Sequence, residues 1–514
     1  MTDTVLILPP AWGIHQPSYA LALLAAGMKE RGLPVRCYDL NIEMHRLAAP
    51  DEKPQWEDEN SIFWVQEEKV RALFKRHSAD IARFLDRVCA EQPKLVGFSV
   101  NCGSKFFSLL LAERLKAKAP SVYVLFGGPD VFRAETGLAY LDSPAVDAVC
   151  TGEADRCFPA FAQGFLSAGA PPEVPGFVFK KPDGRLGDTG DPELITDLDT
   201  LPFADYSHFD FDVYARNDRI ALSTSRGCVN RCTYCSESPN FKRYRSRSAK
   251  SVFREVCFQV GRMQAQRVYI HFCDSLVNGT MHALDELCDL IIAGKGRIPS
   301  FIWGGLMCLR EEMTKPFLKK MYDAGCREIS WGLESGCARV LELMRKRYTP
   351  DVAYRVIRDA HEIGFYQTGN IIVGFPGETE LDFHETIEFV KKTQAYLNAI
   401  GVPMMELRRN SYVYDHPDEF GLANREQLHW RTTDDSNTYE LRLARMRLIH
   451  EAIGNRLFTQ GKFDDEIGLD RGGEGHTRSH AEPVEGADRL LHRRALRAAK
   501  AMAKRLYERL APGR

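Results

Sequence analysis

The sequence predicts two consecutive α/β domains and a mostly helical C-terminal extension. Over residues 1–165, short apolar segments alternate with segments of helical period, which is the pattern of a doubly wound parallel sheet. A second alternation over residues 216–405 contains six such units and predicts a partial (β/α)6 barrel. The chain has 514 residues, more than one ordinary domain needs, which agrees with this division.

The first domain has five apolar segments of strand length. We expect strands at 4–8, 34–39, 95–100, 122–126 and 146–150, and helices at 19–31, 67–91 and 106–119. Glycines and polar residues follow several strands, at the edge where sheets of this kind bind ligands. Prolines and glycines then interrupt the pattern over 166–215, which predicts a linker with a small hairpin at 176–179.

The barrel pattern begins with a strand at Ile220. Further strands are expected at 268–272, 301–303, 328–331, 367–373 and 400–405, with helices at 249–263, 283–293, 314–324 and 350–363. Residues 406–462, with a helix at 440–457, are expected to cap the barrel. Residues 463–514 are polar and then basic, which predicts a disordered segment and a basic helix at 489–510.

Composition gives no sign of a nucleic-acid or membrane partner. The net charge is -2, and the mean hydropathy is -0.31. No apolar run approaches the roughly 20 residues of a transmembrane helix, and the N-terminus lacks the basic start of a signal peptide. We therefore expect a cytoplasmic protein whose 14 cysteines are mostly reduced.

Three cysteines form the most informative cluster in the chain. Cys228, Cys232 and Cys235 have the spacing C-x3-C-x2-C directly after a predicted strand. Three thiolates on one loop can hold three corners of an iron–sulfur cubane, and the absence of a nearby fourth cysteine leaves one iron open. The alternative is a zinc site completed by His208 or His271, neither of which has finger-like spacing. Packing in a core is disfavoured because Arg and Asn flank the cysteines.

With Tyr234 before its last cysteine, this loop resembles that of the radical S-adenosylmethionine (SAM) enzymes, and the resemblance extends over residues 216–405. It implies a [4Fe–4S] cluster on Cys228, Cys232 and Cys235, with SAM bound at the open iron. It also implies an external electron donor of the flavodoxin or ferredoxin type. The implied SAM-binding residues are Tyr234, Asp274, Ser275, Glu334, Ser335, Asn370, Gly374 and Gly377. From the residues alone, Asp274 and Glu334 could equally be surface acids.

The first domain resembles the cobalamin-binding domain that precedes the barrel in many of these enzymes. The resemblance implies cobalamin contacts from Ser99, Asn101, Gly127, Gly128, Gly152 and Glu153. The alternative is a plain flavodoxin-like domain without a ligand. The D-x-H-x-x-G signature of a cobalt-binding histidine is absent, and His15 lies in the first loop without the Asp or Gly of that signature. Ligation of cobalt is therefore left open.

Together these resemblances imply a cobalamin-dependent radical SAM enzyme, with methyl transfer to an unactivated carbon of a small molecule or lipid as the favoured reaction. The substrate is expected between the two domains, over the carboxyl ends of both sets of strands. A non-methylating reaction, such as oxidative cyclisation, rearrangement or bond formation, is the alternative. A cobalamin-binding sensor is the reading from another class, and the three-cysteine loop argues against it.

Overall fold

The computed structural model describes residues 2–133, 135–237, 241–263, 265 and 267–454. The segment expected to be disordered and the basic helix after it, residues 463–514, lie outside this part. The chain divides into two compact units. The first contains Met1–Val229, Glu237–Met307 and Lys320–Arg327, and the second contains Asn230–Ser236, Cys308–Lys319 and the described residues from Glu328 onward.

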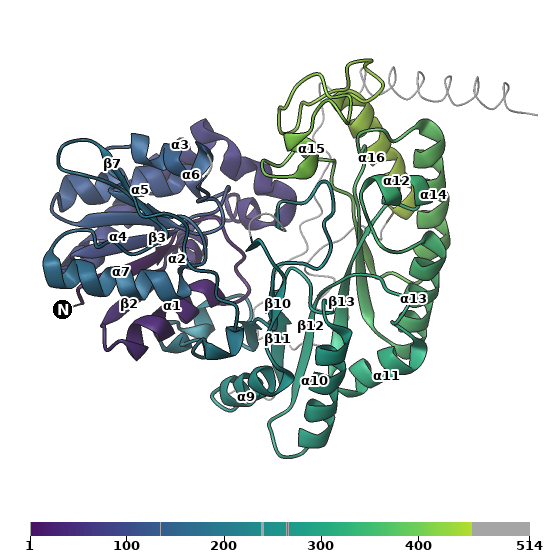
Figure 1. The fold of residues 1–514 in the computed structure, drawn as a ribbon, viewed down its shortest axis with the longest axis horizontal. Coiled ribbons are helices and arrows are strands. Elements are labelled where there is room, and N and C mark those ends of the chain that lie inside the picture. The colour runs from purple at the N-terminus through teal and green to yellow at the C-terminus, as the bar shows by residue number, and fades with distance from the viewer. Residues whose placement is uncertain (1, 134, 238–240, 264, 266, 455–514) are drawn as a thin grey trace, which may run out of the picture. The chain divides into compact units, whose positions relative to one another are not determined.

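The N-terminal sheet confirms the predicted doubly wound fold (Figure 1). Its parallel strands are β1 (Thr4–Leu8), β2 (Val35–Asp39), β3 (Leu95–Ser99), β4 (Tyr123–Gly127) and β5 (Ala148–Cys150). They lie in the flavodoxin-like order β2-β1-β3-β4-β5. The direction of winding changes between β1 and β3, and ligands of such sheets bind at the carboxyl ends of the strands at that point.

Helices cover both faces of this sheet because apolar residues of each strand alternate between them. Leu6 and Leu8 of β1 pack on one face with α1 (Tyr19–Glu30) and α7 (Ala154–Ala168). Val5 and Ile7 pack on the other face. The helices of that face are α2 (Leu40–Leu47), α3 (Glu67–Arg76), α4 (Ser78–Ala90) and α5 (Lys105–Lys118).

Two parts of the first domain differ from expectation. The single helix expected at 67–91 is broken at His77, whose ring is hydrogen-bonded to Glu52 at 2.9 Å and Asp80 at 3.1 Å. The hairpin expected in the linker is longer and belongs to the sheet. Its strands β6 (Phe177–Lys180) and β7 (Leu186–Asp188) run antiparallel beside β5 and extend the sheet to seven strands, so β5 is not an open edge.

The second sheet has six strands in chain order, which confirms the predicted partial barrel. They are β8 (Arg219–Leu222), β11 (Val268–Phe272), β12 (Phe301–Met307), β13 (Cys326–Glu334), β14 (Tyr366–Ile371) and β15 (Ala399–Gly401). The fifth and sixth strands end four residues or fewer from where the apolar pattern predicts. Beyond these ends the pairing continues only as an isolated bridge between Val373 and Met404. Pro403, which has no backbone N–H to donate, interrupts the last strand.

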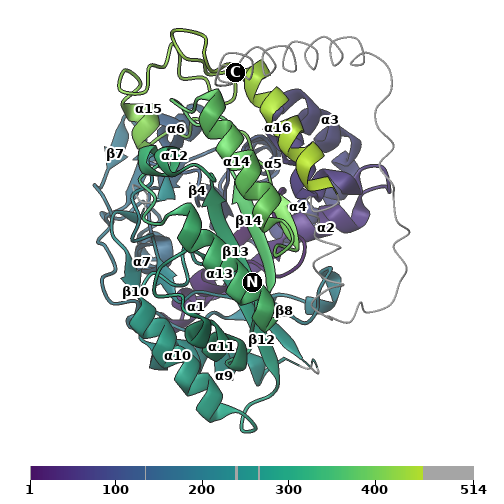
Figure 2. The same cartoon turned by 90° about the vertical axis from the view of Figure 1, so that its right-hand side faces the viewer.

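Helices alternate with these strands (Figures 1 and 2). In the first unit these are α9 (Ala249–Val260) and α10 (Met281–Gly294), which pack on each other. The others are α11 (Lys315–Asp323), α12 (Ala338–Leu343), α13 (Pro350–Ile363), α14 (Glu380–Thr393) and α16 (Tyr439–Ile453). Helix α13 shows why the boundaries fall where they do. Thr349 caps its first turn, Pro350 occupies its first position, and Gly364 ends it with φ 104°.

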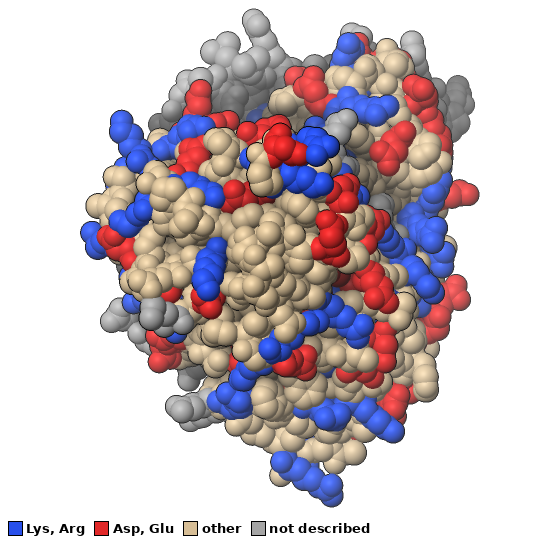
Figure 3. All heavy atoms as spheres, turned by 60° about the vertical axis from the view of Figure 1, so that its left-hand side comes forward, with Lys and Arg blue, Asp and Glu red and all other residues tan. Residues whose placement is uncertain are grey.

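Within the described residues, no helix is both long and apolar enough to span a membrane. Lysine and arginine side chains are interspersed with acidic ones over the face drawn in Figure 3.

Candidate functional site

The segment that contains the three cysteines is tied to the end of β11 on both sides. Before the cysteines, the carboxylate of Asp274 accepts hydrogen bonds from the backbone of Thr224 at 3.0 Å and from the hydroxyl of Ser225 at 2.6 Å. After them, the hydroxyl of Ser275 donates to Glu237 at 2.5 Å. Asp274 is buried, and burial raises the pKa of its carboxyl despite these donors. The structure thus places Asp274 and Ser275 as anchors of this loop.

In the second unit, Thr233 fixes the middle of the same loop. Its amide donates to the carbonyl of Met344 at 3.1 Å and its hydroxyl to that of Leu343 at 3.0 Å, and it accepts from the amide of Val413 at 3.0 Å. Thr233 is fully buried although the cysteines beside it are partly exposed. The loop therefore holds its thiols at an accessible surface on a rigid support.

The three cysteines have the chemistry that a cubane cluster needs. None of them forms a disulfide, and the amide of Cys235 donates to the carbonyl of Cys232 at 3.2 Å, which makes a tight turn. Over the described residues, no three His, Cys, Asp or Glu side chains converge on one point. The three free thiols on one loop match the three corners of a cubane that such a loop can hold.

Within the loop, Tyr234 contacts a buried pair of charged residues at the end of β13. Glu334 accepts hydrogen bonds from the Tyr234 hydroxyl and from Lys346 Nζ, both at 2.9 Å. Lys346 and Glu334 are each about nine-tenths buried. Burial raises the pKa of the Cys232 thiol, and the positive charge of Lys346 opposes that rise. Lys346 thus supplies positive charge beside a prospective thiolate.

Glu334 itself has a strained backbone at a bulge in the strand. Its φ is 59°, and the pairing of β13 with β14 shifts between Gly332 and Glu334. A non-glycine residue with a left-handed backbone is uncommon, and backbone strain of this kind clusters at active sites and ligand clamps. This geometry strengthens the assignment of Glu334 to the site, which the sequence alone left open.

The next predicted residues divide between structural and accessible positions. Ser335 is buried, and its hydroxyl is hydrogen-bonded to Thr386 at 2.9 Å and accepts from the amide of Cys337 at 3.1 Å. Asn370 is partly exposed and lies over Gly401, where an added Cβ would come within 2.3 Å of its side-chain oxygen. Asn370 is therefore the more accessible of the two.

The turn after β14 contains Gly374, Gly377 and a buried acid, Glu378. The amide of Gly374, whose φ is 79°, donates to Glu378 at 3.0 Å, and Arg445 of α16 donates to the same oxygen at 2.9 Å. Burial raises the pKa of Glu378 to about 7, and Arg445 opposes that rise. Gly377 is exposed with φ 85°. A buried ion pair thus fixes the shape of this turn.

A second arginine of α16 braces the same turn. Asn437 donates to the carbonyls of Gly374 at 3.1 Å and Phe375 at 3.3 Å, and Arg442 donates to the side-chain oxygen of Asn437 at 3.0 Å. Arg442 is fully buried and lies so close that a Cβ on Gly374 would come within 2.3 Å of it. The glycine is therefore required by the chain's own packing.

In the N-terminal sheet, Asn101 fastens the loop that follows β1. Its side-chain nitrogen donates to the carbonyl of Ala11 at 3.0 Å, and its oxygen accepts from the amide of Ser104 at 2.7 Å. Asn41 holds the same loop through the amide of Trp12 at 3.0 Å. Asn101 thus joins the ends of β1 and β3, where the winding direction changes, and Asn41 joins the loop after β1 to α2.

This loop leaves buried polar atoms without hydrogen-bond partners. Within the described residues, Trp12 Nε1, His15 Nδ1 and Gln16 Oε1 have no partner. Burial and the nearby Arg219, Arg216 and His45 lower the pKa of His15 to about 4, so its ring is neutral near pH 7. Buried polar groups are rarely left unpaired. Three in one loop at the ligand-binding end of the sheet fit a bound cofactor such as cobalamin.

The remaining predicted residues of this sheet follow β3, β4 and β5. Ser99 and Gly127 are partly exposed, and Gly128 and Gly152 are exposed. Gly128 has φ 110°, and an added Cβ would come within 2.7 Å of the backbone of Val100. A Cβ on Gly152 would come within 2.7 Å of Pro192. Close packing inside the protein accounts for both glycines. The carboxylate of Glu153 accepts hydrogen bonds from Arg226 and Arg245.

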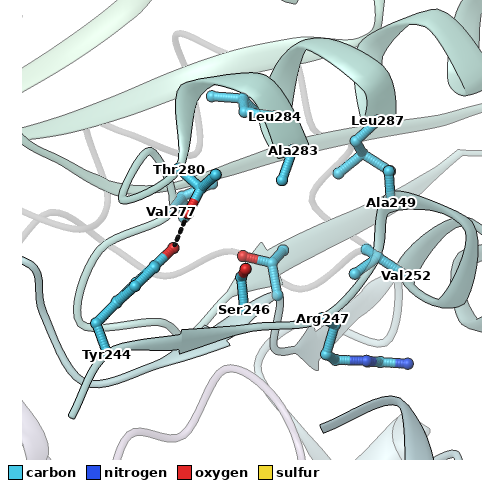
Figure 4. A pocket seen from close by; sticks show the side chains of 11 residues that line it. Tyr244, Ser246, Arg247, Ala249, Val252, Val277, Thr280, Ala283, Leu284 and Leu287 are labelled. Atoms are coloured by element: carbon cyan, nitrogen blue, oxygen red, sulfur yellow. Dashed lines mark hydrogen bonds between the residues drawn. The ribbon is translucent and has the colours of Figure 1, made fainter. Parts of the chain in front are cut away.

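A small pocket lies among β10 (Arg245–Ser246), α9 and α10 (Figure 4). At one end of it, Thr280 is hydrogen-bonded to the hydroxyl of Tyr244 at 3.5 Å. Most of its wall is aliphatic and comes from Ala249, Val252, Val277, Ala283, Leu284 and Leu287. It suits an apolar group rather than a charged cofactor, and we assign no cofactor to it.

Sequence reasoning missed the basic and amide groups of the site. Lys346 lies in a run of three cations, and nothing in that run distinguishes the buried one. Asn437, Arg442 and Arg445 lie more than 55 residues after Gly374, in a segment expected only to cap the barrel. The two arginines are three positions apart on one helix face, a spacing that could have marked them as a pair.

Comparison with known proteins agrees with the fold. Residues 222–390 match the model of the Radical SAM superfamily. The chain is 26% identical over 330 residues to the uncharacterized methyltransferase PH0819 of Pyrococcus horikoshii, covering 61% of this chain and 67% of that protein.

Two solved structures share the fold across both sheets. One is the radical SAM methyltransferase TsrM from Kitasatospora setae with tryptophan and aza-SAM, with a TM-score of 0.60 and 17% identity over 82% of this chain and 77% of that one. The other is the cobalamin-dependent SAM radical enzyme OxsB with aqua-cobalamin and SAM, with a TM-score of 0.63 and 15% identity over 88% and 66%. The fold is therefore that of cobalamin-dependent radical SAM enzymes.

Proposed function

Because this chain is a radical SAM enzyme, we propose that it is a cobalamin-dependent methyltransferase that acts on an unactivated carbon of a small molecule or lipid. One observation carries the proposal. The chain combines a three-cysteine loop on the barrel sheet with a second parallel sheet whose β1 loop contains three orphaned polar atoms. A cobalamin-binding sensor would have no need of the first feature, and a plain radical SAM enzyme would have no need of the second.

In this proposal Cys228, Cys232 and Cys235 hold the [4Fe–4S] cluster. When bound, the cluster supplies the electron that cleaves SAM, and cobalamin supplies a transferable methyl group. The protein contributes orientation and exclusion of side reactions. Tyr234 and Glu334, with the cation of Lys346, would face the polar end of SAM.

The turn from Gly374 to Glu378 would take the adenine, with Asn370 beside it. Backbone groups rather than flexible side chains would make these contacts. The backbone of the turn is fixed because Arg445 binds Glu378 and Arg442 binds Asn437, which donates to the carbonyl of Gly374. Cobalamin would contact the end of β3 at Ser99 and the loop after β1, where Trp12, His15 and Gln16 have polar atoms to satisfy.

The second candidate is a non-methylating radical reaction. It is favoured by the likeness to OxsB, which is named a radical enzyme and not a methyltransferase, whereas PH0819 and TsrM are named methyltransferases. Reconstituted enzyme given methyl-labelled SAM and an extract of the host distinguishes the two. Label in a new product supports methyl transfer. Release of 5′-deoxyadenosine with an unlabelled product supports the alternative. If neither outcome is observed, both candidates are overturned.

The proposed reaction needs one-electron reduction of the cluster, so we propose an external donor of the flavodoxin or ferredoxin type. An oxygen-labile cluster and reduced cysteines suit the cytoplasm. We further propose that the substrate lies where the carboxyl ends of both sheets can reach it, because a carbon that first loses hydrogen and then gains methyl must approach both cofactors to about 3–3.5 Å.

A further inference from the structure

Two arginines stand side by side at the base of the cysteine loop. Strands β9 (Ser225–Arg226) and β10 pair antiparallel, with Arg226 directly opposite Arg245. Opposed residues of such a pair project from the same face of the hairpin with their Cβ atoms about 5 Å apart. Arg226 lies two residues before Cys228, so whatever holds this hairpin also holds the start of the cysteine loop.

The charges of both arginines are balanced by the N-terminal sheet. Both terminal nitrogens of Arg226 donate to Asp155, at 2.6 and 2.8 Å, and one also donates to Glu153 at 3.0 Å. Arg245 donates to Glu153 at 2.9 Å and to the carbonyl of Ile195 at 2.7 Å. All these atoms belong to the first compact unit.

This cluster is buried and nearly neutral overall. The four charged side chains are between 6% and 13% exposed. Burial opposes ionisation of Asp155, but Arg226 outweighs it and lowers the pKa of that carboxyl. Buried ion pairs contribute little net stability compared with apolar packing, whereas removing one partner leaves an uncompensated charge. Their best-supported use is to define one arrangement of the chain over others.

The position of the acids makes this arrangement relevant to the cofactors. Glu153 caps α7 and Asp155 lies in its first turn, shortly after β5, so both lie at the carboxyl end of that strand. The family resemblance implies cobalamin contacts at this end, from Gly152 and Glu153. Glu153 is committed to the arginines and is not available to a corrin. Gly227, which lies between Arg226 and Cys228, packs closely as well. Its φ is 74°, and a Cβ there would come within 3.0 Å of Arg243 and Phe241.

We propose that Arg226, Arg245, Glu153 and Asp155 form a positioning latch that holds the cysteine loop at a fixed distance from the cobalamin-binding edge of the N-terminal sheet. The inference rests on the proposed function for the identity of the two cofactors. It assigns to Glu153 a role different from the cobalamin contact that the family resemblance implies. These residues position the cofactors and do not touch the reacting atoms.

The first test measures cofactor separation in the full chain with a reconstituted cluster and cob(II)alamin. The reduced cluster accelerates the electron-spin relaxation of cob(II)alamin, and this effect falls steeply with distance. We expect Arg226→Asp to weaken the acceleration and the charge-exchanged pair Arg226→Asp with Asp155→Arg to restore most of it. Arg185→Ala, which removes an exposed ion pair with Asp183, is the matched control and leaves it unchanged. Unchanged acceleration in Arg226→Asp with iron and cobalt retained overturns the latch.

The second test needs neither cofactor. Asp155→Asn is isosteric and removes one buried charge, so we expect amide hydrogen exchange at residues 152–155 and 226–228 to accelerate by about tenfold or more. Exchange at wild-type rates overturns the latch. A wild-type chain that takes up no cobalt would defeat the proposed function instead, and the exchange result would still decide whether the latch exists.

Discussion

The two parallel sheets end in different kinds of chemistry at their carboxyl edges. In the barrel sheet, β13 ends at Glu334, which is paired with Lys346, and the turn after β14 contains Glu378, which is paired with Arg445; all four groups are buried. In the N-terminal sheet, β3 and β4 end in Ser99 and Gly127, and an amide side chain, Asn101, fastens the nearby loop.

This difference matches two kinds of ligand. A small zwitterion such as SAM is recognised by a few fixed charges, which are strong in a buried setting. A large flat cofactor needs open backbone and unfilled space, and the loop after β1 offers both an unfilled position at Gly13 and unpartnered polar groups. The carboxyl ends of the barrel strands, called the first edge, should therefore be sensitive to changes of charge. The carboxyl ends of the N-terminal strands, called the second edge, should be sensitive to changes of volume.

Loss of the three cysteines should have the largest effect. Replacing Cys228, Cys232 and Cys235 together with Ala removes every thiolate of the loop, so we expect no bound iron or sulfide and no 5′-deoxyadenosine from SAM. Cobalt uptake should persist, because the second edge is unchanged. Cys257→Ala, a partly buried cysteine of α9, is the control and should retain the cluster. A triple variant with a full complement of iron would contradict the assignment.

Lys346→Met should come next. It leaves the buried carboxylate of Glu334 without its cation, and breaking such a pair costs about 3–5 kcal/mol of folding stability. SAM binding should weaken as well, measured by equilibrium dialysis against the reconstituted enzyme. Adding Glu334→Gln removes the stranded charge and should recover most of the stability but not the SAM affinity. Recovery of both would show that Lys346 is only structural.

Arg445→Met should destabilise the protein in a pH-dependent way. Burial already raises the pKa of Glu378 to about 7, above the 4.5 of an unfolded chain, so the native state binds the extra proton and stability falls as pH rises between these values. Without Arg445 the carboxylate loses its partner. The variant should therefore lose more stability at about pH 8 than at about pH 5, as measured by urea unfolding. An equal loss at both pH values would place the effect in packing.

Volume at the second edge gives the smallest and most selective effect. A Cβ on Gly13, in the loop after β1, meets no atom within 4 Å, unlike a Cβ on Gly128. Gly13→Trp should lower cobalamin uptake while leaving the melting temperature near that of Gly13→Ala, and it should spare the cluster. Normal uptake in Gly13→Trp would move the cofactor away from this loop.

The sequence predicts architecture and the cysteine loop more fully than it predicts the supporting groups. Apolar periodicity located all five parallel strands of the first sheet and all six of the second, because each strand must bury its own side chains. It missed that β6 and β7 join the first sheet, since pairing across a proline-rich segment depends on distant hydrogen bonds.

The candidate site shows the same limit. Local spacing identified Cys228 and its partners because one loop supplies all of them. Lys346 acts on Glu334, 12 positions away, and Arg445 acts on Glu378, 67 positions away, so only the fold reveals these pairs. For Glu153 the resemblance implied a cofactor contact, whereas in the fold its carboxylate accepts hydrogen bonds from Arg226 and Arg245.

The most direct test is a count of iron, sulfide and cobalt per chain after anaerobic reconstitution with iron, sulfide and cobalamin. It tests whether the carboxyl ends of the two sheets bind two separate cofactors. We expect about four iron, about four sulfide and about one cobalt per wild-type chain. The cysteine triple variant should keep the cobalt alone, and Gly13→Trp should keep the iron and sulfide but bind less cobalt than the wild type. A wild-type chain with iron and sulfide but no cobalt, or with cobalt lost together with the cysteines, would contradict the independence of the two edges.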